Sequence, residues 1–95
     1  MEIHLQNSLH ERISEKVGDD LNQSFLSLCR EAPESSVLRG VQAIGDTMFN
    51  ELQCRRLVDE LTRIPEASRL PVIRRVMELA LQASSCHGYL YISGD

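Results

Sequence analysis

Residues 84–95 read SSCHGYLYISGD, and the strand predicted within this short stretch requires another segment of the chain to pair with it. Gly88 has the place of a residue just past a helix end, where glycine is favoured. Residues 89–92 are too few and too rich in β-favouring side chains for a helix, so they predict a short strand. An isolated strand is unstable in water and needs a partner. Residues 3–5 and residues 41–44 are the two segments that offer one.

Most of the remaining chain has helical spacing. In residues 49–65, FNELQCRRLVDELTRIP, apolar side chains recur at the steps of an amphipathic helix. Asn50 and Gln53 have the spacing of a capping box, which satisfies amides at a helix start. A further helix is expected from Ser68, with Pro71 in its first turn, where its missing N–H is harmless.

The N-terminal third also predicts a helix. From Ser8 on, apolar residues recur every four positions, and Ser8 with Glu11 has capping-box spacing. Pro33 ends this segment because proline disfavours a helical residue before it. Residues 18–20, GDD, either divide the segment into two helices or are tolerated within one. The expected fold is therefore mostly α, a bundle of three to four helices with a short C-terminal strand, forming a single helical domain over residues 1–95.

Composition narrows the function classes. The chain is 42% hydrophobic, which suits a folded domain, and its apolar runs are far shorter than the roughly 20 residues that span a bilayer. Its first residues lack the pattern of a signal peptide, so we expect a cytoplasmic protein that does not associate with membranes. A net charge of −4 and only four aromatic side chains argue against nucleic-acid binding.

Cysteine and histidine offer little chemistry in this sequence. Three cysteines leave one unpaired in any disulfide scheme, and each lies within or at the end of an apolar segment. No CxxC or HxxxH spacing indicates a metal site. Cys86 and His87 are adjacent, but they lie at an expected helix C-terminus, where the dipole disfavours a thiolate. We therefore expect no enzyme activity, no metal and no cofactor.

Two stretches carry a resemblance. Residues 45–61, GDTMFNELQCRRLVDEL, and residues 88–95, GYLYISGD, resemble small bacterial proteins without an assigned activity. Those proteins share a DT-x-FN-x-x-Q helix start, a helix ending in EL, and an apolar final strand ending in GD. The resemblance covers about the C-terminal half and implies a bacterial origin. It implies no activity, so it assigns no functional residues.

Charge distribution leads to the functional prediction. Residues 1–50 hold four basic and eight acidic side chains and so carry the whole net charge of −4. We expect a non-enzymatic protein–protein interaction protein, of the immunity or antitoxin-like inhibitor kind, that docks a basic partner by electrostatic attraction. Residues 33–47 are irregular yet apolar, and they either pack onto the core or contact the partner. The expected binding residues are Glu11, Glu15, Asp19, Asp20, Val37, Leu38 and Val41.

Two alternatives remain open at this point. One is a homodimer of structural or regulatory character, in which the exposed edge of the last strand pairs across a two-fold axis. The other is a small thiol or metal protein that uses Cys86, His87, His4 or His10.

Overall fold

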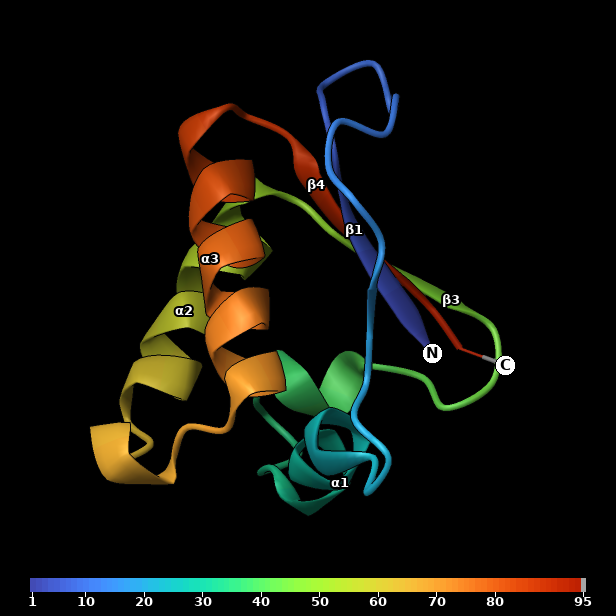
Figure 1. The fold of residues 1–95 in the computed structure, drawn as a ribbon. Coiled ribbons are helices and arrows are strands. Elements are labelled where there is room, and N and C mark those ends of the chain that lie inside the picture. The colour runs from blue at the N-terminus through green and yellow to red at the C-terminus, as the bar shows by residue number, and fades with distance from the viewer. Residues whose placement is uncertain (95) are drawn as a thin grey trace.

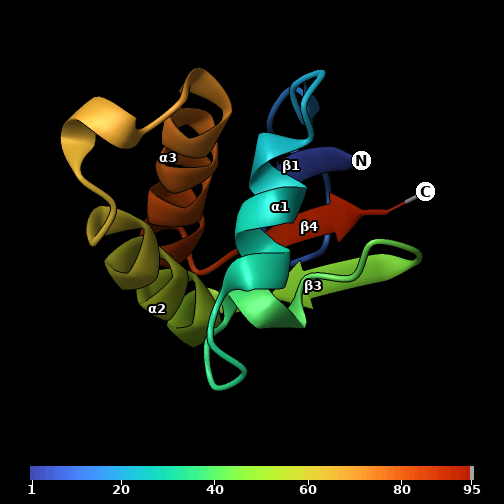
Figure 2. The same ribbon diagram turned by 90° about the horizontal axis from the view of Figure 1, so that it is seen from below.

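The structure, a computed structural model, describes residues 1–94. The described residues form a four-stranded antiparallel sheet. Figures 1 and 2 show the helices gathered on one side of β1, β3 and β4, and no helix of the described chain covers the other side. Short 3₁₀ turns occur at Leu38–Gly40 and Glu66–Ser68. Along the chain the main elements are β1 (Glu2–Gln6), β2 (Val17–Gly18), α1 (Ser24–Glu31), β3 (Asp46–Phe49), α2 (Glu51–Thr62), α3 (Pro71–Ser85) and β4 (Tyr89–Ser93).

The expected mostly α bundle is wrong. The chain is 44% helical, and 18% of it forms the antiparallel sheet, which makes this an α+β fold. The N-terminal region is responsible, because a loop of residues 7–16 and the short strand β2 stand where a helix was expected to begin at Ser8. Leu9 and Ile13, which have the four-residue spacing of a buried helix face, instead lie exposed in this loop. Apolar spacing indicates a helix only where the side chains are buried, and here they are not.

The expected C-terminal strand is confirmed as β4. It pairs with β1, one of its two expected partners, through Leu5 opposite Leu90. Its second neighbour is β3 instead of residues 41–44. The strand order is β2-β1-β4-β3, so both edges of β4 are already paired. A dimer through the edge of the last strand is therefore ruled out, and this correction leaves other dimer contacts untested.

The core lies between the inner face of the sheet and the helices. Strand side chains alternate, so every second residue of β1 and β4 points toward the helices. The inward-pointing Ile3, Leu90 and Ile92 are fully buried, and they pack in one hydrophobic cluster with buried residues of all three helices. Burial of apolar surface on this one face supplies the main driving force for folding.

Helix ends match the sequence in most places. Asn50 and Gln53 form the expected capping box at α2. The last helix, α3, begins at Pro71, three residues after the expected start at Ser68, because residues 66–68 form the 3₁₀ turn. Ala32 is extended just after α1, as expected of a residue before proline. Within residues 1–94 no helix has both the length and the apolar character needed to cross a membrane.

Gly88 has a different role from the expected one. The left-handed residue after α3 is His87, with φ of 55°. Gly88 instead marks the point where β4 passes closest to β1. A Cβ atom placed there would lie 2.1 Å from the backbone oxygen of Gln6, which is far inside contact distance. Only glycine lets the chain turn from α3 into β4 at this separation from β1.

Candidate functional site

The face of the sheet that no helix covers gathers unusual side chains for so small a chain. Residues opposite one another in the register form rows, such as His4 beside Tyr91 beside Met48. Both tyrosines of the protein and two of its three histidines lie on or against this face. We call it the outer face, and it consists of Glu2, His4, Gln6, Asp46, Met48, Tyr89, Tyr91 and Ser93, with His10 lying over it.

Two imidazole–phenol stacks order the outer face. The rings of His4 and Tyr91 are 4.9 Å apart with 23° between their planes. His10, from the 7–16 loop, lies 4.2 Å from Tyr89 at 22°. Each stack leaves rings partly exposed to solvent while holding them in a fixed orientation. Aromatic pairs in this offset arrangement contribute about 0.5–1.5 kcal/mol beyond their buried area.

Gln6 connects the two stacks. Its Nε2 lies 3.0 Å from Nε2 of His4, and its Oε1 lies 3.3 Å from Nδ1 of His10. Gln6 is only 8% exposed and is the one buried polar residue of the described chain. We call this three-residue arrangement the imidazole–amide bridge. It ties the 7–16 loop to the sheet in addition to the backbone bond that the Ile13 amide donates to Leu5.

The two edges of the outer face differ from its centre, and the β3 edge carries an acidic residue, Asp46, and an apolar one, Met48. The carboxylate of Asp46 accepts a hydrogen bond from Tyr91, which raises the pKa of that phenol because the bond favours its neutral form. Met48 is 41% exposed on the edge strand β3. Glu2 pairs with Lys16 at 3.6 Å on the other side of the face. The surface thus combines aromatic, apolar and charged groups within four strands.

Glu11 and Glu15, two of the predicted binding residues, lie at the surface. Both belong to the 7–16 loop and are exposed. The loop is shaped by Asn7, whose side-chain oxygen accepts hydrogen bonds from the amides of Leu9 and Glu11. Because these residues form a loop and not a helix, the expected acidic stripe along a helix is absent. Both carboxylates are carried by the loop that also holds His10.

Asp19 and Asp20, the other two predicted acids, hold the start of α1. Asp19 accepts bonds from the amides of Phe25 and Leu26 at 3.0 Å each. Asp20 accepts from the amide of Ser24 at 2.8 Å. Hydrogen bonds from the side chain and backbone of Ser24 lower the pKa of Asp20. Since the first amides of a helix lack internal partners, these carboxylates are engaged in capping.

Val37, Leu38 and Val41, the predicted apolar contacts, are buried in the core. The carboxylate of Glu60 on α2 accepts hydrogen bonds from the amides of Val37 and Leu38, at 2.8 and 3.0 Å. Of the two alternatives left open for this connector, the structure has the packed one. The seven predicted residues therefore do not form one surface.

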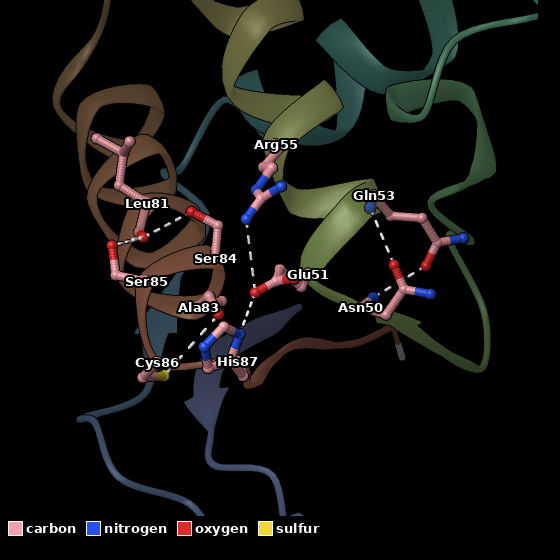
Figure 3. Close-up of polar contacts among 10 residues, drawn as sticks. All are labelled: Asn50, Glu51, Gln53, Arg55, Leu81, Ala83, Ser84, Ser85, Cys86 and His87. Atoms are coloured by element: carbon pink, nitrogen blue, oxygen red, sulfur yellow. Dashed lines mark hydrogen bonds and ion pairs between the residues drawn. The ribbon is translucent and has the colours of Figure 1, made fainter.

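Cys86 and His87 point to different partners at the end of α3. Figure 3 shows the Cys86 sulfur directed at the Ala83 carbonyl oxygen, 3.9 Å away, while the His87 ring contacts Glu51. Glu51 also lies 3.7 Å from Arg55. The imidazole is thus engaged with a carboxylate and does not face the thiol, so the pair lacks the geometry of a nucleophile with its base.

The other thiols are inert for a different reason. Burial raises the pKa of Cys29 to about 12 and that of Cys54 to about 11, so both stay protonated at neutral pH. Within residues 1–94 no three of the histidine, cysteine and acidic side chains come together as metal ligands would.

The outer face was missed from the sequence although its pattern is visible there. Tyr89 and Tyr91 alternate with Leu90 and Ile92, which places both tyrosines on the same side of a half-buried strand. His4 alternates with Ile3 and Leu5 in the same way. What the sequence hides is the pairing that places these residues side by side.

Comparison of the chain with protein-family models, with curated proteins and with solved structures gave no match. The resemblance to small bacterial proteins therefore stays a prediction.

Proposed function

We propose that this protein is a non-enzymatic binding protein that docks a basic protein partner on its outer face. One observation carries the proposal. In a chain with only four aromatic residues, both tyrosines gather with two histidines on the one sheet face that no helix covers. The core does not require them there, because the inner face alone buries the apolar cluster.

The side chains of the outer face suit recognition. Tyrosine presents a large amphipathic surface with few rotatable bonds, so little conformational entropy is lost when a partner covers it. Stacking against His4 and His10 already restricts both phenol rings. Such preorganisation lowers the cost of binding, since less ordering remains to be done in the complex.

The negative charge of the N-terminal half favours a basic partner. Residues 1–50, which supply three of the four strands, carry the whole net charge of −4. Asp46 lies beside Tyr91, and the 7–16 loop adds the exposed carboxylates of Glu11 and Glu15. A lysine or arginine of a partner can contact a phenol ring face through a cation–π interaction, with a carboxylate nearby. The narrower form of the proposal, an immunity or antitoxin-like inhibitor, stays a prediction.

A matched pair of lysine variants tests the proposal. Met48→Lys places a positive charge on the outer face, where the native side chain is 41% exposed. Leu70→Lys introduces the same charge just before α3, at a side chain 47% exposed and away from the sheet. Tagged wild-type protein and both variants are used to capture proteins from a bacterial lysate at low salt, and each captured protein is then purified and titrated back.

We expect wild type and Leu70→Lys to bind the same basic protein, and Met48→Lys to bind it at least about tenfold more weakly. Equal binding by all three proteins would contradict an outer-face site. Failure of wild type to retain any basic protein under these conditions would contradict the proposal as a whole. Light scattering of the unbound protein tests whether a second copy of this chain occupies the outer face. If the protein is a dimer that Met48→Lys separates into monomers, the homodimer alternative replaces the proposal.

A further inference from the structure

The imidazole–amide bridge has a property that follows from counting its protons. An amide side chain has one oxygen that accepts and one nitrogen that donates. In the observed orientation, Gln6 Nε2 donates to an unprotonated Nε2 of His4, and Nδ1–H of His10 donates to Gln6 Oε1. Turning the amide by 180° exchanges the two roles. In either orientation, one of the two ring nitrogens that face Gln6 carries a proton and the other does not.

The bridge can therefore hold one additional proton but not two. If one imidazole becomes charged, it donates to the amide oxygen, and the neutral ring accepts from the amide nitrogen. If both imidazoles are charged, every ring nitrogen carries a proton. One N–H then faces the NH₂ group of Gln6, and that contact is repulsive. Because Gln6 is only 8% exposed, water cannot readily replace the lost bond while the loop stays in place.

Neighbouring charges act in the same direction on one of the rings. The pKa of His4 is lowered by its partial burial and by the positive charges of Arg12 and Lys16, against a smaller opposing effect of Glu2. Tyr91 stacks on His4, and its phenol is bonded to Asp46 and stays neutral. The loop that carries His10 also holds the charged residues Glu11, Arg12, Glu15 and Lys16, and the carboxylate of Glu11 accepts a hydrogen bond from Asn7 at 3.4 Å.

We propose that the imidazole–amide bridge is a pH-sensitive device that holds the 7–16 loop on the outer face when at most one imidazole is charged and releases it when both are. The weakest point of the loop is His10, a non-glycine residue with φ of 64°. Strain at such a residue persists only while its surroundings hold it. Loss of the Gln6 bond and of the Tyr89 stack removes both side-chain restraints on His10 and leaves the backbone bond that its amide donates to Asn7.

The sign of the effect follows from proton linkage. The open or unfolded chain binds protons on both histidines near the ordinary pKa of about 6.5, whereas the closed bridge resists the second proton. The contribution of the bridge is therefore complete above the ordinary histidine pKa of about 6.5 and is lost as the pH falls below it. On the proposed function, on which this part rests, two imidazolium charges on the outer face also repel a basic partner, so binding weakens over the same range.

Nuclear magnetic resonance of the isolated protein tests the device without any partner. From pH 8 to pH 5, we expect His4 and His10 to titrate with midpoints about one pH unit or more apart. Contacts between the ring protons of His10 and Tyr89 should disappear with the second step. Simultaneous titration of both rings near pH 6.5, or ring contacts that persist after both rings are charged, would overturn the proposal.

Three variants sharpen the measurement. Gln6→Glu offers two acceptor oxygens, so both charged rings can donate, and the His10–Tyr89 contact should survive at pH 5. His10→Asn keeps a residue that tolerates positive φ, and it leaves His4 to titrate in a single step. This second variant keeps the test usable if Gln6→Glu folds poorly. His87→Asn removes the third histidine, outside the bridge, and should leave the two-step titration unchanged. Loss of the ring contact in folded Gln6→Glu as in wild type, or a two-step titration in His10→Asn, would count against the device.

A binding measurement separates this inference from the proposed function. The captured basic protein is titrated at pH 7.5 and pH 5.5 against wild type and Gln6→Glu. We expect about a tenfold loss of affinity for wild type and a clearly smaller loss for Gln6→Glu. If the bridge opens by magnetic resonance but affinity does not change with pH, the link to docking on the outer face is overturned while the device itself stands.

Discussion

The two faces of the sheet are built from alternate residues of the same strands, yet they do different work. In β4, Leu90 and Ile92 are fully buried against the helices, while Tyr89 and Tyr91 remain partly exposed on the other side. The inner face is uniformly apolar and holds the fold together. The outer face carries rings, an amide and carboxylates that folding alone does not demand. On the proposed function, the comparison teaches that substitutions one residue apart should alter stability and binding separately.

The largest effect should come from the inner face. Leu90→Ala removes a fully buried side chain from the centre of the sheet and should lower the free energy of unfolding by about 3 kcal/mol. Tyr91→Thr, one residue later, should cause a clearly smaller loss, because its side chain is partly exposed and threonine suits a strand. Urea denaturation measures both. Equal losses for the two variants would break the distinction between the faces.

A smaller effect should come from the point where the two layers join. Gly88→Ala places a Cβ atom 2.1 Å from the Gln6 backbone oxygen, so β4 must move away from β1. We expect a loss of about 2 kcal/mol, typical of an overpacked site. Gly40→Ala is the control, since its Cβ would meet only a Phe49 ring atom at 3.8 Å. Thermal or urea unfolding that ranks the two glycines equally would contradict the role given to Gly88.

The smallest stability effect separates the acids that support the fold from those left for a partner. Asp19→Ala removes the acceptor of two amides at the start of α1 and should cost about 1 kcal/mol. Glu15→Ala, in the exposed loop, should leave the free energy of unfolding unchanged while weakening the binding of a basic protein. Urea denaturation measures both free energies of unfolding. A larger loss for Glu15→Ala than for Asp19→Ala would show that these carboxylates have been assigned to the wrong roles.

Helices and turns with strong local patterns were predictable from the sequence. The capping box of Asn50 and Gln53 and the apolar steps of α2 depend on neighbours along the chain, so they hold in any fold. The strand at residues 89–92 was predictable from its β-favouring residues and from the glycine before it. Its pairing with residues 3–5 was one of two alternatives that the sequence left open, and the other, residues 41–44, is not a strand of the sheet.

The N-terminal third was not predictable in the same way. The helical spacing of Leu9 and Ile13 is misleading, because both side chains are exposed in a loop that hydrogen bonds along β1 hold in place. Asp19 and Asp20 were expected to meet a partner, but both accept hydrogen bonds from the first backbone amides of α1. The outer face escaped notice because it joins β1, β3 and β4, which lie more than 40 residues apart at its extremes.

The central claim is that the outer face is where this protein meets its partner. Its most direct test is amide chemical-shift mapping on isotope-labelled protein as the captured basic protein is added. We predict that the largest changes fall on β1, β3 and β4 and on the 7–16 loop, with α2 and α3 little affected. Changes confined to α2 and α3, with the strands undisturbed, would contradict the account.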